Sequence, residues 1–133
     1  EMQCTALMLA HVALLPCGPD PTEVWGLTES VELVRAAMAR RPELKPRIVL
    51  TRKDHRTGLG RGARLSLEQL GIPLLDTELG RRVTYPEALA AGKGPTTYDP
   101  RSSAAAEVRR LVSELERLVA VDAKPTGRAK GSR

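Results

Sequence analysis

Two short apolar segments, residues 11–16 and 46–51, flank a stretch with helical periodicity, and this arrangement constrains the fold more than any other feature. Both segments have the length and composition of buried β-strands. Between them, apolar side chains recur at alternating spacings of three and four, at Val24, Leu27, Val31, Val34 and Met38. This spacing places them on one face of an α-helix. A strand, a helix and a strand in this order predict a right-handed βαβ unit with parallel strands.

The ends of this helix carry typical start and stop signals. Asp20 is a good N-cap residue, and Pro21 suits the first helical position. Glu23 resembles the acidic partner of a capping box. Arg41 and Pro42 follow the last apolar position and indicate the end of the helix.

The alternation continues after the second strand. Leucines in residues 65–70 predict a second helix that ends at Gly71, and residues 72–76 predict a third short strand. Residues 77–83 are expected to form a polar, basic loop. The sequence therefore predicts an α/β fold with a short parallel sheet flanked by helices.

Two more helices are expected in the rest of the chain. Residues 85–91 predict a short helix that stops at Gly92, and residues 93–100 are expected to be irregular. The last helix has its apolar positions at Ala104, Val108, Leu111, Leu115 and Leu118. We expect one domain over residues 1–121 and a disordered basic tail over residues 122–133.

The net charge of +5 is unevenly distributed along the chain. Residues 35–64 contain ten lysines and arginines but only two acidic residues, Glu43 and Asp54. Residues 124–133 are basic and contain no acid. Such polarised charge is typical of a nucleic-acid-binding surface, although a solvated face and a disordered end would give the same pattern. With no Phe, one Trp and two Tyr, the chain does not resemble a base-stacking platform for single strands.

Three glycines, Gly58, Gly60 and Gly62, lie among arginines in the stretch TRKDHRTGLGRG of residues 51–62. No Lys-Ser or Lys-Thr pair follows them, so the stretch is not a Walker A phosphate loop, and no other part of the sequence matches that motif. A dinucleotide fingerprint is excluded by the spacing of the glycines. The remaining interpretation is a flexible turn before the next helix.

The sequence gives no sign of a self-contained catalytic or metal site. Cys4 and Cys17 form no CxxC pair, which argues against a zinc site and a disulfide framework. His11 lies within an apolar segment, and His55 has no acidic cluster or nucleophile at a suggestive spacing. We therefore expect no catalytic residue and no metal ligand in this chain.

An apolar run at residues 6–15 is too short to span a bilayer and lacks the basic start of a signal peptide. We expect a cytoplasmic protein without membrane contact. Glu1 opens directly into a segment that looks structured, and three strands are few for this fold class. The chain is therefore expected to be part of a larger protein.

Three loops follow the predicted strands, at residues 16–21, 51–60 and 76–84. In open parallel sheets, ligands bind at the carboxyl ends of the strands. Because all three loops are expected at that edge, they are the candidate binding loops.

Three successive segments carry a family resemblance: ALLPCGPDPTEVW, then PRIVLTRKDHRT, then GIPLLDTELGRRVTYPEALAAGKGPTTYDPRSSAAAEVRRL. In this order, over roughly residues 6–120, the chain resembles the carboxyl-terminal half of ParA-type partition ATPases, deviant Walker A proteins related to MinD. The resemblance implies a partial P-loop NTPase (Rossmann-like) fold with three layers. For the intact family it implies ATP and Mg²⁺ as cofactors, non-specific DNA and a ParB-like protein as partners, a homodimer, and association with the nucleoid.

The resemblance also implies roles for particular residues. Those corresponding to the purine pocket are Thr51, Arg52, Thr84, Tyr85, Pro86 and Glu87. The expected DNA-binding residues are Arg56, Arg61, Arg64, Arg81 and Arg82, of which Arg61 and Arg64 are assigned from their place in the basic loop.

Several family features are absent from this sequence. Thr84 replaces a basic residue of the family's DNA surface, and His11 stands where relatives usually carry Asp. The Walker A lysines, the Mg²⁺ ligands and the Walker B aspartate belong to a segment that this chain does not contain. We therefore predict that the chain alone neither hydrolyses ATP nor binds it tightly.

Two other functions are consistent with the sequence. One is a stand-alone basic nucleic-acid-binding module without ATPase activity. The other is an oligomerising interaction protein in which an exposed sheet edge pairs with another chain. The chain itself would be a truncated gene product or a proteolysed form in the ParA-like interpretation.

Overall fold

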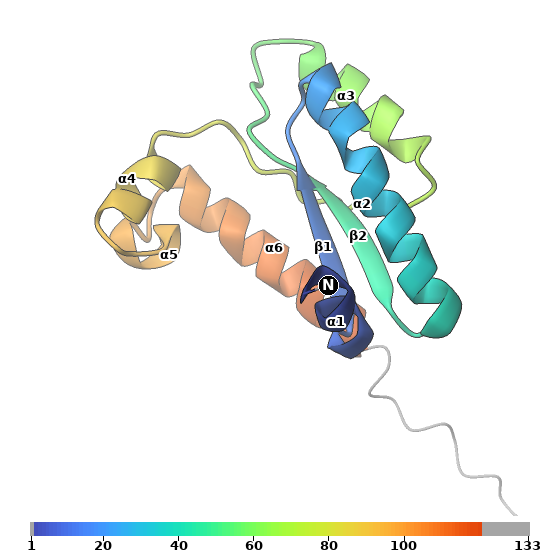
Figure 1. Ribbon diagram of the computed structural model, residues 1–133. Coiled ribbons are helices and arrows are strands. Elements are labelled where there is room, and N and C mark those ends of the chain that lie inside the picture. Colours follow the sequence, from blue (N-terminus) through green and yellow to red (C-terminus); the bar gives the residue numbers. More distant parts are fainter. Residues whose placement is uncertain (1, 121–133) are drawn as a thin grey trace, which may run out of the picture.

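A computed structural model describes residues 2–120 of the chain (Figure 1). The elements in chain order are α1 (Met2–Leu9), β1 (Val12–Cys17), α2 (Pro21–Arg40), β2 (Lys45–Leu50), α3 (Leu59–Glu68), α4 (Thr84–Ala90), α5 (Pro95–Tyr98) and α6 (Ser103–Ala120). Two parallel strands are flanked by helices, so the expected α/β class is confirmed, as a partial Rossmann-like arrangement. In Figure 1, α2 and α3 lie on one side of the strands and α6 on the other.

The predicted βαβ unit is β1, α2 and β2. The two strands pair in parallel, with Val12 opposite Lys45 and Cys17 opposite Leu50. Asp20 caps α2, because its carboxylate accepts the N–H of Thr22 at 2.8 Å. The observed bounds differ from the predicted ones by one residue or so, which is normal for element ends.

The apolar stripe of α2 packs on the strands and forms the core. Its buried residues are Val24, Leu27, Val31, Val34 and Ala37, while Met38 is partly buried beside them. Ile48 of β2 and Leu67 of α3 are also fully buried. Each fully buried Val, Leu or Ile side chain contributes about 1.5–3 kcal/mol to the stability of the fold through its transfer out of water.

The prediction of a third regular strand at residues 72–76 is wrong. Residues 72–80 make only two isolated parallel bridges in the described chain, Ile48 to Leu74 and Lys53 to Gly80. This edge segment, residues 72–80, bulges away from β2 between the amides of Leu75 and Leu79, which donate to the carbonyls of Ile48 at 2.8 Å and Leu50 at 2.9 Å. There the amides of Asp76 and Thr77 donate to the carboxylate of Glu114 in α6, each at 2.8 Å.

Other predicted boundaries also need correction. The second helix begins at Leu59, so Gly60 and Gly62 lie inside α3 and not in a flexible turn. The irregular stretch 93–100 contains the short helix α5. Helix α1 was not predicted from the sequence. The predicted tail, residues 122–133, lies outside the described residues.

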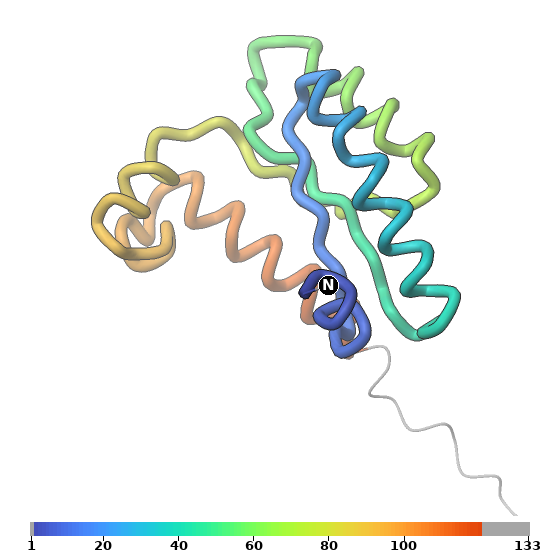
Figure 2. Tube along the Cα trace, viewed as in Figure 1, coloured from blue at the N-terminus to red at the C-terminus, as the bar shows by residue number. Residues whose placement is uncertain are grey.

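The chain that follows α3 contains the third candidate loop and leads from the sheet to α4. Figure 2 shows this segment passing the strands and then crossing to α4, before α6 runs back toward α1. α4 and α6 match their predicted positions, although Ala104 is the only predicted apolar position of α6 that is fully buried. None of the helices in residues 2–120 has the length and apolar character needed to cross a membrane.

Candidate functional site

The three candidate loops meet at the carboxyl edge of the sheet, as expected. The amide of Thr51 donates to the carbonyl of Cys17 at 2.8 Å and thereby joins the first two loops. The amide of Lys53 donates to Leu79 at 3.1 Å, and the amide of Arg81 donates back to Lys53 at 2.9 Å. These bonds continue the parallel pairing beyond the end of β2 and fix the second and third loops side by side.

A cavity of about 720 Å³ lies between the second and third loops. Its walls include the apolar side chains of Leu79, Val83 and Pro86 and the ring of Tyr85. Its volume falls within the ~300–1,000 Å³ that is typical of small-molecule sites. An apolar pocket with cationic groups around it suits an anionic ligand with a flat, apolar part.

Four of the six residues expected in a purine pocket line this cavity: Thr51, Arg52, Tyr85 and Pro86. The other two, Thr84 and Glu87, lie on α4 outside the lining.

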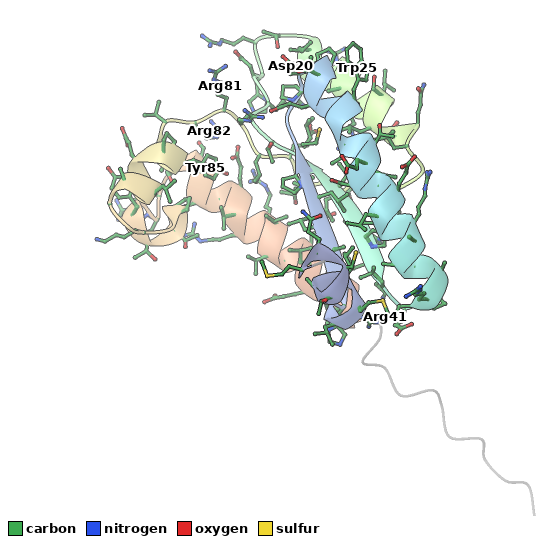
Figure 3. The ribbon with its side chains drawn as sticks, viewed as in Figure 1. Asp20, Trp25, Arg41, Arg81, Arg82 and Tyr85 are labelled. Atoms are coloured by element: carbon green, nitrogen blue, oxygen red, sulfur yellow. The ribbon has the colours of Figure 1, made fainter. Side chains whose placement is uncertain are left out.

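Three of the five arginines expected to contact DNA line the same cavity: Arg56, Arg81 and Arg82. Figure 3 shows Arg81, Arg82 and Tyr85 along the segment that leads into α4. The side chain of Arg56 is 89% exposed and pairs with Asp54 at 3.2 Å. The structure thus brings part of each predicted group of residues to one place.

The remaining two arginines lie on α3, away from the cavity. Arg61 is exposed. Arg64 is partly buried, because its guanidinium donates to the carbonyl of Leu75 at 3.2 Å and pairs with Glu68 at 3.5 Å. Its position makes Arg64 a link between α3 and the edge segment more than a free surface cation.

Arg52 sits at the centre of the three loops. Its φ of 52° lies in the left-handed region, which is uncommon for a residue other than glycine. Its guanidinium pairs with Glu23 on the first turn of α2, so Glu23 does not complete the expected capping box. Gly18 lies directly beneath this pair, and a Cβ there would collide with the Glu23 carboxylate.

Sequence reasoning missed Glu107, which supports the cavity wall from α6. This carboxylate is 2% exposed and accepts hydrogen bonds from Arg82 Nε at 2.7 Å and from the Tyr85 hydroxyl at 2.9 Å. Burial, and then the hydrogen bond to Glu107, raise the pKa of the Tyr85 phenol. One signal was present in the sequence: Glu107 interrupts the apolar face of the last helix, three residues after Ala104.

The described residues contain no cluster of three or more His, Cys, Asp or Glu side chains that could hold a metal ion. The cavity therefore offers binding by arginines, backbone groups and apolar walls. No Ser, Cys, His, Asp or Glu side chain is among the described residues that line it.

Together, these observations describe a partial Rossmann-like chain with a cavity lined by four arginines at the carboxyl edge of its sheet. The chain is similar to the "Maintenance of carboxysome distribution protein A" of Halothiobacillus neapolitanus, with 29% identity over 113 residues, which cover 84% of this chain and 52% of that protein. The similarity indicates distant homology to part of that protein.

Two uncharacterised proteins of Mycobacterium tuberculosis, from two strains, are each 34% identical to the chain over 90 residues. The match covers 67% of this chain but 28% of each of them. The chain thus corresponds to about half or less of the length of these relatives. No protein-family model matches the chain.

Proposed function

We propose that this chain is the carboxyl-terminal portion of a ParA-like chromosome or plasmid partition ATPase, to which it contributes adenine-pocket loops and a non-specific DNA-binding surface. The observation that carries the proposal is the cavity in which Thr51 and Arg52 meet Tyr85 and Pro86. The two pairs lie more than thirty positions apart in the sequence, and the same four residues were expected around the base. The similarity to a protein named for carboxysome distribution supports a role in positioning a cargo inside the cell.

The cavity walls suit a purine. The ring of Tyr85, Pro86 and the side chains of Leu79 and Val83 offer apolar surface to a flat base. Arg56 and Arg81 are exposed at the rim and favour an anionic group attached to that base. The surrounding loops also offer backbone carbonyls and amides for hydrogen bonds to base edges.

In the intact family, ATP and Mg²⁺ complete the site, and ATP supplies the energy that drives dimerisation. The residues of this chain fit the base but not the phosphates or the metal. The sequence has no Walker A loop, and the described residues hold no acidic cluster for Mg²⁺. We therefore propose that the chain alone binds adenosine weakly and does not turn over ATP.

Nuclear magnetic resonance tests the base site directly. Adenosine added to the full chain should shift the signals of Thr51 and Tyr85 and leave those of Trp25, at the start of α2, unchanged. Without phosphate contacts, we expect a dissociation constant of about 1 mM, equivalent to roughly 4 kcal/mol. Uridine at the same concentration is the control, and equal shifts with both nucleosides, or none with adenosine, would refute the proposal.

The DNA surface is proposed to include the exposed arginines at the rim of the cavity and Arg61 on α3. If they neutralise phosphates, the logarithm of the DNA association constant should fall linearly with the logarithm of salt concentration. Salt-dependent DNA binding by a chain that does not bind adenosine would favour the second candidate, a stand-alone nucleic-acid-binding module. The 89% exposure of the Arg56 side chain is the observation behind that candidate.

The remaining parts of the proposal concern partners. By analogy with the family, the intact protein would dimerise, act with a ParB-like protein and associate with the nucleoid in the cytoplasm. The alternative of an oligomerising interaction protein rests on β1, which pairs only with β2 among the described residues and leaves Leu14 37% exposed. Sedimentation of the full chain separates these cases, because edge pairing predicts an oligomer that forms without nucleotide or DNA.

A further inference from the structure

We propose that Glu107 is a positioning residue, whose buried carboxylate holds the cavity wall in the shape that accepts a purine. The proposal rests on the proposed function, because it assigns to α6 a part in that same site. Glu107 does not line the cavity itself. It acts through three residues that do, Gly80, Arg82 and Tyr85.

Both oxygens of the Glu107 carboxylate accept hydrogen bonds. One oxygen, Oε2, accepts the amide of Gly80 at 3.1 Å and the hydroxyl of Tyr85 at 2.9 Å. The other, Oε1, accepts Nε of Arg82 at 2.7 Å. At 2% exposure this charge has left water almost completely, which is tolerated only because strong donors surround it.

These bonds determine what the wall presents to a ligand. The hydroxyl of Tyr85 is directed at α6, so the ring offers its apolar carbon surface to the cavity. The charge of Arg82 is matched by Glu107 and that of the exposed Arg56 by Asp54. The cationic side chains at the rim include the exposed Arg81. One carboxylate thus keeps the wall beside the base neutral and apolar.

The three residues that donate to Glu107 are spaced so that their hydrogen bonds also hold the backbone before α4 in place. Gly80, Arg82 and Tyr85 span the whole connection between the edge of the sheet and the first turn of α4. Gly80 is closely packed, since an added Cβ would lie 3.1 Å from Oε1 of Glu107. Loss of the carboxylate would free the connection at three points at once.

The chain contains a matched control in Glu114. It lies on the same helix and also accepts two backbone amides from the edge segment, those of Asp76 and Thr77, each at 2.8 Å. Neither of these residues lines the cavity. Glu114→Gln should therefore weaken the attachment of the segment to α6 without changing the wall.

The experiment compares Glu107→Gln and Glu114→Gln in the full chain, with adenosine affinity and urea unfolding measured for each. Glu107→Gln should weaken adenosine binding at least tenfold, while Glu114→Gln should change it less than twofold. A ligand-free measurement accompanies these: phenolate absorbance should show Tyr85 ionising at lower pH in Glu107→Gln and unchanged in Glu114→Gln. If Glu107→Gln does not fold, Tyr85→Phe takes its place and should weaken adenosine binding severalfold.

Two results would overturn the inference. One is adenosine binding by folded Glu107→Gln, or by Tyr85→Phe in its place, within twofold of the unmodified chain. The other is an equal loss of affinity in both glutamine variants, which would indicate a general structural effect. If the unmodified chain binds no adenosine, the proposed function fails, and the inference about purine fit fails with it. An altered Tyr85 titration confined to Glu107→Gln would then show that only the purine assignment was wrong and that the carboxylate does hold the wall.

Discussion

Two glycines of α3 provide a matched pair of substitutions. Gly60 and Gly62 both lie inside the helix, Leu59–Glu68. A Cβ on Gly62 would have no neighbour within 4 Å, whereas a Cβ on Gly60 would lie 2.7 Å from Cγ of Lys53. Because Cγ is close to the backbone, Lys53 cannot clear the contact by moving its tip and must change its rotamer.

The two substitutions should therefore change stability in opposite directions. Replacing a helical glycine by alanine is worth up to about 1 kcal/mol, so Gly62→Ala should stabilise the fold by ~0.5–1 kcal/mol. In Gly60→Ala, the same gain is opposed by displacement of Lys53 from Glu78, whose Oε2 lies 2.9 Å from Nζ. Both partners are 22% exposed, and a partly buried carboxylate left without its donor costs about 1–3 kcal/mol. We expect Gly60→Ala to be about 1–2 kcal/mol less stable than the unmodified chain.

Urea unfolding followed by far-UV circular dichroism measures both changes, with unaltered m-values as the check on two-state behaviour. A Lys53→Ala background supplies the decisive control. Without the lysine stem, Gly60→Ala should become as stabilising as Gly62→Ala. The reasoning is refuted if Gly60→Ala is the more stable variant in the native background, or if it stays destabilising once Lys53 is removed.

Three further results are expected. Burial and a neighbouring carboxylate raise the pKa of Tyr85. Its contribution to the free energy of unfolding is therefore complete below pH ~10 and is lost as the pH rises further. Tyr85→Phe should remove this alkaline loss of stability, as measured by urea unfolding. Burial alone would raise the pKa of Glu114, but hydrogen bonds from backbone amides lower it. Its contribution to the free energy of unfolding is therefore present above pH ~4.3 and is lost as the pH falls. Glu114→Gln should reduce this loss of stability at acidic pH. Arg56→Ala and Arg81→Ala should each reduce the salt slope of DNA binding by about one, whereas Arg64→Ala should leave the slope unchanged and lower stability.

The βαβ unit could be predicted from the sequence because its signals are local. The apolar stripe of α2, its Asp20 cap and the two short apolar runs are all read within a few residues of the elements they define. The meeting of the three loops also followed, since parallel strands bring their carboxyl ends to one edge. The base-pocket residues and most of the arginines were instead implied by the family resemblance, and the structure places four of the former and three of the latter around one cavity.

The errors have a common cause, which is that tertiary contacts overrode local patterns. Residues 72–76 look like a strand, but the amides that follow bond to Glu114, 38 residues from Asp76 in the sequence. The glycines at 60 and 62 argue against a helix, yet α3 forms because Ala63 and Leu67 are buried against the core. The role of Glu107 depends on donors that are 22 or more residues away, which no local pattern reveals.

Helix α6 explains how the edge segment can leave the sheet and still be held. Glu107 and Glu114 lie seven residues apart, which is two helical turns, so both carboxylates point to the same side of α6. Between them they accept the amides of Asp76, Thr77 and Gly80, so these backbone donors are paired although the edge segment forms no regular strand. The edge segment therefore bulges away from β2 after Leu75, pairs with it again where Leu79 bonds to Leu50 and Gly80 bridges to Lys53, and then runs on to form the wall of the cavity.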